Sequence, residues 1–327
     1  MKVTIIGPGF GNIPPNGWGA VEIIIWNLKL YLEKLGVQVF IINIPNEYDI
    51  INAINNINPD IVHIHYDNWH YLANRFNCKI VICTNHFAYI EDPMRCNWDF
   101  VINLANSNAI IHCLSKGIYN LYKTLNVSDD RLFILPNGAE ENKFRFTMKP
   151  IYSNKSIYLG QINDRKKQYI YQSLQFIDFV GNYSDSNFNK NIINYLGEWT
   201  KELLYNNLTD YANLVLLSDG EAHPLVCCEA LNAGLGLVVS TYAAANLDIT
   251  KPFITIIPND KLYDLDYIKK AILENQKISL TMRKEIHDYG FNNFSWINII
   301  KKYYDIYKLY MIVFYIKNFC SFIHCLN

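Results

Sequence analysis

Short apolar runs alternate with longer amphipathic stretches along the first half of the chain. The runs that read as strands span 3–7, 37–44, 60–65, 79–84, 98–103, 109–113 and 131–135, and the helical stretches span 20–35, 49–58 and 116–125. Gly36 ends the first helical stretch, and the hydroxyl of Ser115 can cap the last. Strands that alternate with helices predict a parallel sheet with helices on both faces.

The same alternation restarts after a polar segment at 139–155, which contains Pro150. An apolar run at 156–160 and a helical stretch at 166–174 follow, with further apolar runs at 178–182, 194–198, 213–218, 236–240 and 253–258. We therefore predict an α/β protein with two Rossmann-like, doubly wound parallel-sheet domains, 1–145 and 146–293, that face a cleft. Ligands of such sheets bind at the carboxyl ends of the strands.

Composition excludes several classes of protein. The 327 residues include 29 basic and 30 acidic side chains, for a net charge of −1, whereas nucleic-acid binders usually carry a basic excess. The first residues read as a strand and not as a signal peptide, so eight cysteines indicate reduced thiols in a cytoplasmic protein. We find no C-x2-C pairs that suggest a zinc site and no apolar segment long enough to span a bilayer.

The segment 216–240 carries the most chemical information. It reads as strand, polar turn, helix, glycine and strand, with Glu221 in the turn and Glu229 in the helix. Pro224 suits the first helical position and Gly234 the residue after the helix. The free N–H groups at such a helix start attract phosphate, and a carboxylate one turn in can accept hydrogen bonds from two ribose hydroxyls.

This segment resembles the E-x7-E region of retaining glycosyltransferases of the GT-B type, the large group 1 or family 4. The resemblance implies that Glu229 binds the ribose of a nucleotide-sugar donor, that Glu221 contacts the transferred sugar, and that the amides of Leu225 and Val226 bind the diphosphate. The alternative is structural, because a glutamate in a turn and another on a helix recur throughout α/β proteins.

The start of the second predicted domain adds cations. The family has G-R after this strand and then a lysine, often in R-K-G or R-K-N-Q. Gly160 matches, but Gln161 replaces the arginine, and Arg165 and Lys167 are the remaining candidates to stabilise the leaving diphosphate. Lys167 is the better match to the family lysine.

The glycine-rich loop at 7–22 argues against a dinucleotide site. Asn12 stands where the third glycine of G-x-G-x-x-G is due, and Asn43 replaces the expected acidic residue. The loop instead resembles the first loop of the glycosyltransferases, in which Gly19 would let the backbone approach a diphosphate; a plain glycine-rich turn is the alternative.

Three histidines follow two of the predicted strands. The family has D-x-x-H-x-H and T-x-H at these places, and Thr84-Asn85-His86 matches the second. We expect His86 to face the donor sugar and His63 and His65 to be structural. The segments 111–120 and 132–144 also match the family, the latter with Glu140 or Glu141 near its usual aspartate.

The resemblance covers roughly residues 1–308. It implies a closing helix at 294–308 that crosses back over both domains, and the apolar tail at 309–327 is then a buried helix, a peripheral membrane contact or a frayed end. The implied activity is a hexosyltransferase of glycan biosynthesis, which moves a sugar from a nucleoside diphosphate donor to a glycan or lipid acceptor held by the first domain. It implies no metal or other cofactor. The alternatives are an inactive GT-B subunit, which Gln161 favours, and a Rossmann-type oxidoreductase.

Overall fold

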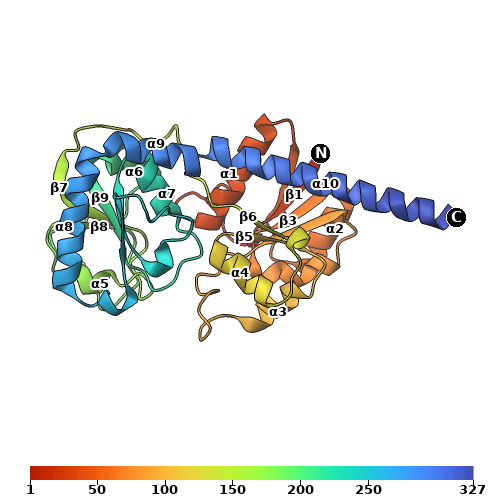
Figure 1. The fold of residues 1–327 in the computed structure, drawn as a ribbon, viewed down its shortest axis with the longest axis horizontal. Helices are drawn as coiled ribbons and strands as arrows, with labels where there is room; N and C mark the ends of the chain where they lie inside the picture. Colours follow the sequence, from red (N-terminus) through yellow and green to blue (C-terminus); the bar gives the residue numbers. More distant parts are fainter. Residues whose placement is uncertain (327) are drawn as a thin grey trace. The chain divides into compact units, whose positions relative to one another are not determined.

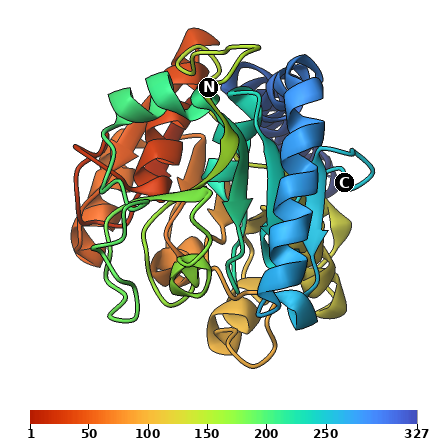
Figure 2. The same ribbon diagram turned by 90° about the vertical axis from the view of Figure 1, so that its left-hand side faces the viewer.

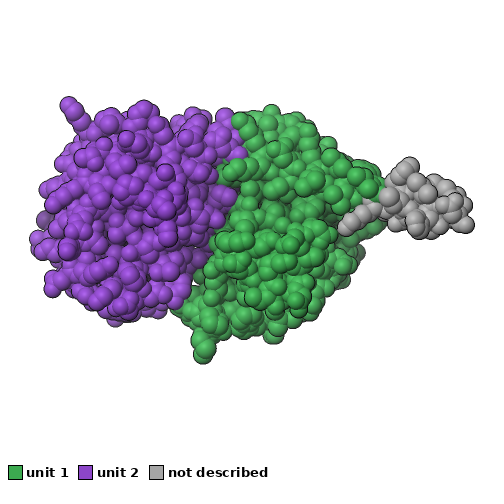
Figure 3. Space-filling view, in the orientation of Figure 1, with its two compact units in different colours: residues 1–135, 299–327 green, residues 136–298 purple. Residues whose placement is uncertain are grey.

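The chain forms two compact units. The computed structural model describes residues 1–326, and side chains as far as Ile316. Unit 1 comprises Met1–Leu135 and Ile299–Asn327, and unit 2 comprises Pro136–Asn298 (Figure 3). The boundary between the units thus lies at Pro136, whereas the sequence pattern places it at 145. The C-terminal segment belongs mostly to unit 1.

Unit 1 is built on a six-stranded parallel sheet of order β2-β1-β3-β4-β5-β6 (Figure 1). Its strands are buried apolar runs, as expected where helices cover both faces of a sheet. The strands are β1 Lys2–Ile6, β2 Gln38–Ile42, β3 Ile61–Ile64, β4 Ile80–Thr84, β5 Ile110–Cys113 and β6 Leu132–Ile134. The helices are α1 Ala20–Lys34, α2 Glu47–Ile57, α3 Trp98–Ala105 and α4 Lys116–Thr124, with 3-10 helices η1 at Asp67–Asn74 and η2 at Asp129–Arg131.

One predicted strand of this unit is wrong. The run 98–103 forms the start of helix α3, because Asn97 accepts a hydrogen bond from the Phe100 N–H at 3.3 Å and so caps a helix. Its buried residues Phe100, Val101 and Leu104 have helical spacing. The predicted cap of α4 is confirmed, since the Ser115 hydroxyl accepts from the Ile118 N–H at 2.9 Å.

Unit 2 contains a five-stranded parallel sheet of order β11-β10-β9-β7-β8. Its strands are β7 Tyr152–Leu159, β8 Ile177–Val180, β9 Tyr211–Leu216, β10 Gly236–Ser240 and β11 Ile254–Ile257. Its helices are α5 Gln168–Tyr171, α6 Lys201–Asn207, α7 Leu225–Asn232, α8 Leu265–Thr281 and α9 Arg283–Phe294, with 3-10 helices η3 Leu208–Asp210, η4 Thr241–Ala243 and η5 Asn259–Lys261. Helix α8 packs along β9 and β10, as Figure 2 shows.

Two predicted elements of unit 2 differ from the structure. The helix expected at 166–174 is reduced to α5, because Lys167 adopts a left-handed conformation with φ 57° and interrupts it. The run 194–198 forms no strand. It adjoins β8 through a bridge between Tyr195 and Phe179, and the Asn194 amide donates to the Ile177 carbonyl at 2.7 Å.

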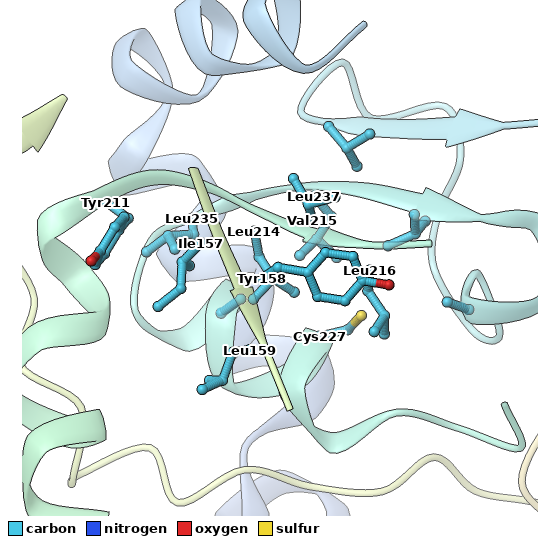
Figure 4. Packing of buried hydrophobic residues seen from close by; sticks show 14 of the residues in the cluster. Ile157, Tyr158, Leu159, Tyr211, Leu214, Val215, Leu216, Cys227, Leu235 and Leu237 are labelled. Atoms are coloured by element: carbon cyan, nitrogen blue, oxygen red, sulfur yellow. The ribbon is translucent and has the colours of Figure 1, made fainter. Parts of the chain in front are cut away.

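A buried tyrosine connects the core of unit 2 to the loops at one edge of its sheet through hydrogen bonds. Ile157, Leu159 and Leu214 pack from neighbouring strands in the cluster that Figure 4 shows. The fully buried Tyr158 hydroxyl donates to the Lys166 carbonyl and accepts from the Leu217 N–H at 2.8 Å. It therefore fixes the loops that follow β7 and β9 against each other.

The last helix, α10 at Trp296–Leu326, begins in unit 2 and joins unit 1 from Ile299 onward. In unit 1 it buries Tyr303 and Tyr307, and the Tyr307 hydroxyl lies 2.6 Å from Nδ1 of His63 on β3. Among the residues that the structure describes, no helix is long and apolar enough to cross a membrane. The expectations for the tail concern side chains that lie, from residue 317 onward, outside those described.

The strand orders locate a binding edge in each unit. A doubly wound sheet binds ligands where the chain changes direction across the sheet, outside the carboxyl ends of the two strands at that point. In unit 1 these strands are β1 and β3, since β2 lies beyond β1. In unit 2 they are β7 and β9, since β8 lies on the other side of β7.

Candidate active site

The loops after β7 and β9 bring three charged side chains together. The Glu221 Oε1 atom lies 2.7 Å from an Arg165 guanidinium nitrogen and 2.8 Å from Lys166 Nζ. The guanidinium also donates to the Gly220 carbonyl at 2.5 Å, and the Asp219 N–H donates to the Arg165 carbonyl at 2.9 Å. These contacts hold the cluster at the edge where unit 2 is expected to bind ligands.

The cluster has a net positive charge. Burial opposes the ionisation of Glu221, but the Lys166 and Arg165 cations outweigh it and lower the carboxyl pKa below its usual value. The carboxylate is therefore ionised at neutral pH and offsets one of the two cations. The remaining positive charge, next to a sheet edge, suits an anionic group of a ligand.

Lys167 points to different partners. Its Nζ lies 3.3 Å from Asp164 and 3.5 Å from Asp219, so its charge faces two carboxylates. Burial works to lower its pKa, but the two aspartates prevail and raise it. The cation beside Glu221 is instead Lys166, which sequence reasoning missed. The R-K-G form of the family motif could have found it, because Lys167 occupies the glycine position and has the left-handed backbone that glycine favours.

Gly160 makes room for the Lys166 side chain. A Cβ at Gly160 would lie 3.3 Å from Cε of Lys166, and its φ of 138° is one that other residues rarely adopt. Gln161, which replaces the family arginine, is exposed, and its carbonyl accepts from the Gln168 amide at 3.1 Å.

The turn and helix of the E-x7-E region form largely as predicted. Helix α7 begins at Leu225. Pro224 is therefore the N-cap residue and not, as the sequence predicts, the first residue of the helix. The N–H groups of Leu225 and Val226 donate to none of the described residues, so both can bind a ligand. Gly234 follows the helix with φ 83°, which confirms the left-handed position.

Glu229 lies half-buried on α7 in an acidic surrounding. Burial raises the pKa of its carboxyl to about 7, the nearby Glu140 adds to the shift, and Lys201 opposes it. Glu229 accepts no hydrogen bond from the described residues, whereas Glu140 accepts one from the Tyr205 hydroxyl at 2.8 Å. A desolvated carboxylate with free acceptor atoms is poorly stabilised in the unliganded protein, and hydroxyl donors would stabilise it.

The two remaining predicted residues, Gly19 and His86, belong to unit 1. Gly19 precedes α1, and a Cβ there would lie 2.5 Å from a carboxylate oxygen of Glu22. The His86 ring is half-buried and lies 3.2 Å from the His65 ring, and burial lowers its pKa to about 3. Neutral His86 can exchange hydrogen bonds with a sugar hydroxyl but carries no charge at neutral pH.

The dinucleotide alternative finds no support in the glycine loop. The Asn43 side chain accepts from the Gly9 N–H at 2.7 Å and donates to the Gly11 carbonyl at 2.9 Å. It therefore fills the turn in which a pyrophosphate would bind. No group of metal-ligating side chains occurs among residues 1–326 as far as their side chains are described.

His63 forms part of a buried network in the sheet of unit 1. Its Nε2 lies 2.7 Å from the Thr84 hydroxyl, which lies 2.8 Å from His112 Nδ1, and His112 Nε2 lies 2.9 Å from the Leu135 carbonyl. All its members are buried, which agrees with the expected structural role of His63.

Comparison with solved structures gives the same architecture. The chain is similar to sucrose-phosphate synthase from Thermosynechococcus elongatus, with a TM-score of 0.75, 15% identity and coverage of 95% of this chain and 99% of that one. It is similar to Anabaena HepE, solved with UDP-glucose (TM-score 0.67, 13% identity, 92% and 98% covered), and to the lipopolysaccharide outer core galactosyltransferase WaaB (0.68, 14%, 94% and 99%). No protein-family model matches the sequence, and a comparison with curated proteins gives no match. The two parallel-sheet units and these similarities show that the chain has the GT-B fold of glycosyltransferases.

Proposed function

We propose that the protein is a glycosyltransferase that moves a hexose from a nucleoside diphosphate sugar to an acceptor with retention of configuration. The observation that carries the proposal is the cluster of Arg165, Lys166 and Glu221 at the ligand-binding edge of unit 2. UDP is the first nucleotide to test, because HepE has been solved with UDP-glucose and with UDP.

The proposed donor contacts follow from the chemistry of each group. Glu229 accepts hydrogen bonds from the ribose hydroxyls. The N–H groups of Leu225 and Val226 and the cations Arg165 and Lys166 bind the diphosphate, where negative charge grows as the sugar leaves. Glu221 contacts the transferred sugar.

Three further residues of the sequence prediction keep proposed roles. Gly19 and His86 would act from unit 1, on the diphosphate and on the sugar respectively. Gly160 provides space for the cation beside it. Catalysis would consist mainly of positioning and of charge stabilisation, without a metal ion.

A thermal-shift panel of UDP, GDP, ADP and NAD, at about 100 times each dissociation constant where one is measurable, tests the proposal. Such a ligand adds roughly 2.7 kcal/mol to the stability of the state that binds it. We expect a shift with one nucleoside diphosphate and none with NAD. A shift with NAD alone would exclude a nucleotide-sugar site.

Retention is tested separately. The anomeric configuration of a product formed from an α-linked donor, read by proton NMR, should remain α, and the reaction should continue in EDTA. A β product would contradict the retaining assignment, and loss of activity in EDTA that added metal restores would contradict the metal-free assignment.

A further inference from the structure

A row of aromatic side chains lies at the ligand-binding edge of unit 1. Phe10 follows β1, and Tyr66 follows β3, so this pair joins the two strands at which the chain changes direction. Their rings form an edge-to-face contact with centroids 5.6 Å apart. The row continues through Trp69, 6.1 Å from Tyr66, to Tyr71, 6.3 Å further on. Phe10 is 60% exposed and Tyr71 44%, so the row presents aromatic surface to the solvent.

Polar groups are interleaved with these rings. Asp67 follows Tyr66, and its Oδ1 accepts a hydrogen bond from the His86 N–H at 3.0 Å. Its second oxygen accepts none from the described residues. The neighbouring Asn68 is exposed and donates to the Tyr66 hydroxyl at 2.9 Å. A carboxylate oriented by the backbone, with one oxygen free, is a suitable acceptor for a ligand hydroxyl.

Buried polar atoms at the same edge lack a partner in the part of the chain that the structure describes. The indole N–H of Trp69 and Nε2 of the fully buried His65 form no hydrogen bond with the described residues. Burial also raises the pKa of the Asp67 carboxyl to about 7, although the His86 N–H opposes the shift. Buried polar groups in folded proteins are nearly always satisfied, so these atoms make the edge a place where a hydrogen-bonding partner is favoured.

We propose that Phe10, Tyr66 and Asp67 bind the acceptor of the transfer reaction, and that this acceptor is a carbohydrate. The inference rests on the proposed glycosyltransferase function and adds the class of the acceptor to it. A pyranose ring presents a face of C–H groups to an aromatic ring and hydroxyls at its rim to a carboxylate, which is the combination found here. A lipid chain would need a continuous apolar surface, whereas Asp67 and Asn68 interrupt this one.

The test uses the full-length protein on an array of immobilised oligosaccharides, with vesicles of phosphatidylethanolamine and phosphatidylglycerol in parallel. The oligosaccharide that binds best is then titrated against the variants Phe10→Ala, Phe10→Trp and Asp67→Asn. Matched controls are Phe291→Ala, an exposed phenylalanine of unit 2, and Asp49→Asn, an exposed aspartate of α2. UDP affinity is measured on every sample.

We expect oligosaccharide binding to weaken about tenfold in Phe10→Ala and in Asp67→Asn, to persist in Phe10→Trp, and to be unchanged in both controls. Binding to vesicles without binding to any oligosaccharide would overturn the proposal. Oligosaccharide affinity that stays at the wild-type level in both Phe10→Ala and Asp67→Asn would also overturn it. If these variants lose oligosaccharide while the wild type fails to bind any nucleotide, the donor proposal fails and the carbohydrate site stands.

Discussion

Lys166 Nζ lies 2.8 Å from the Glu221 carboxylate, although the two residues follow different strands of the unit 2 sheet. Lys167, the next residue, faces Asp164 and Asp219 instead. The backbone causes this division, because the left-handed conformation of Lys167 directs adjacent side chains to different surroundings. The cluster around Lys166 has a net positive charge, whereas Lys167 and its two aspartates together have a net negative charge.

Lys166→Ala should therefore lower turnover more than Lys167→Ala. A cation that stabilises charge on the leaving diphosphate acts mainly in the transition state, and its removal costs on the order of a hundredfold in kcat. The measurement is sugar transfer or donor hydrolysis by both variants, with UDP affinity measured separately. The larger loss in Lys167→Ala would support the sequence-based choice of cation and would assign Lys166 to the support of Glu221.

Gly160→Ala should perturb the same cation through the backbone. The φ of 138° strains any residue with a Cβ, at a cost of about 1–3 kcal/mol in stability. The added methyl group would also press against Cε of Lys166. We expect a lower urea midpoint together with weaker UDP binding. Gly17→Ala is the control, since a Cβ there meets no atom within 4 Å. If Gly160→Ala is destabilised but binds UDP like the wild type, the backbone strain at position 160 does not affect nucleotide binding.

Much of the fold is predictable from the sequence because buried parallel strands appear as apolar runs whatever the rest of the chain does. Helix α3 was missed because eight residues that begin with an apolar cluster fit a strand or a helix, and the Asn97 cap decides between them. Lys166 was missed because its direction depends on a left-handed neighbour. Asp67 belongs to no motif, and only the strand order shows that it lies near Phe10. The acidic surrounding of Glu229 depends on Glu140, which is distant in sequence.

The buried histidines of unit 1 predict a steep loss of stability in acid. Burial lowers the pKa of His63 and His65 well below the usual value, and that of His112 to about 4. A base whose folded pKa is depressed contributes stability above its unfolded pKa, near 6.5, and loses it as the pH falls. Between pH 6 and pH 5 each such histidine should remove up to about 1.4 kcal/mol per pH unit from the unfolding free energy. Urea unfolding at several pH values measures how the unfolding free energy changes per pH unit. A change smaller than that expected for the uptake of one proton would contradict the burial of these histidines in the neutral form.

Glu229→Gln should weaken nucleotide binding and stabilise the unliganded protein at the same time. The carboxyl has a folded pKa of about 7, above its unfolded value, so its contribution to stability is complete below the unfolded pKa and is lost as the pH rises through 7. At pH 8 the wild type must hold a poorly solvated carboxylate that the amide variant lacks. The variant should then be more stable by at most ~3 kcal/mol, with little of this difference left at pH 5.

The same carboxylate should make nucleotide affinity depend on pH. Ionised Glu229 accepts hydrogen bonds from both ribose hydroxyls, so the affinity for the donor nucleoside should rise between pH 6 and pH 8, and Glu229→Gln should lose about tenfold to a hundredfold at pH 8. Uridine serves as the probe beside UDP, because it has no phosphate that titrates in this range. For the variant we expect a flat uridine profile. If Glu229→Gln gains stability at pH 8 but binds uridine and UDP like the wild type, Glu229 lies outside the nucleotide site. If the variant loses affinity without gaining stability, the carboxylate is well solvated before the ligand binds.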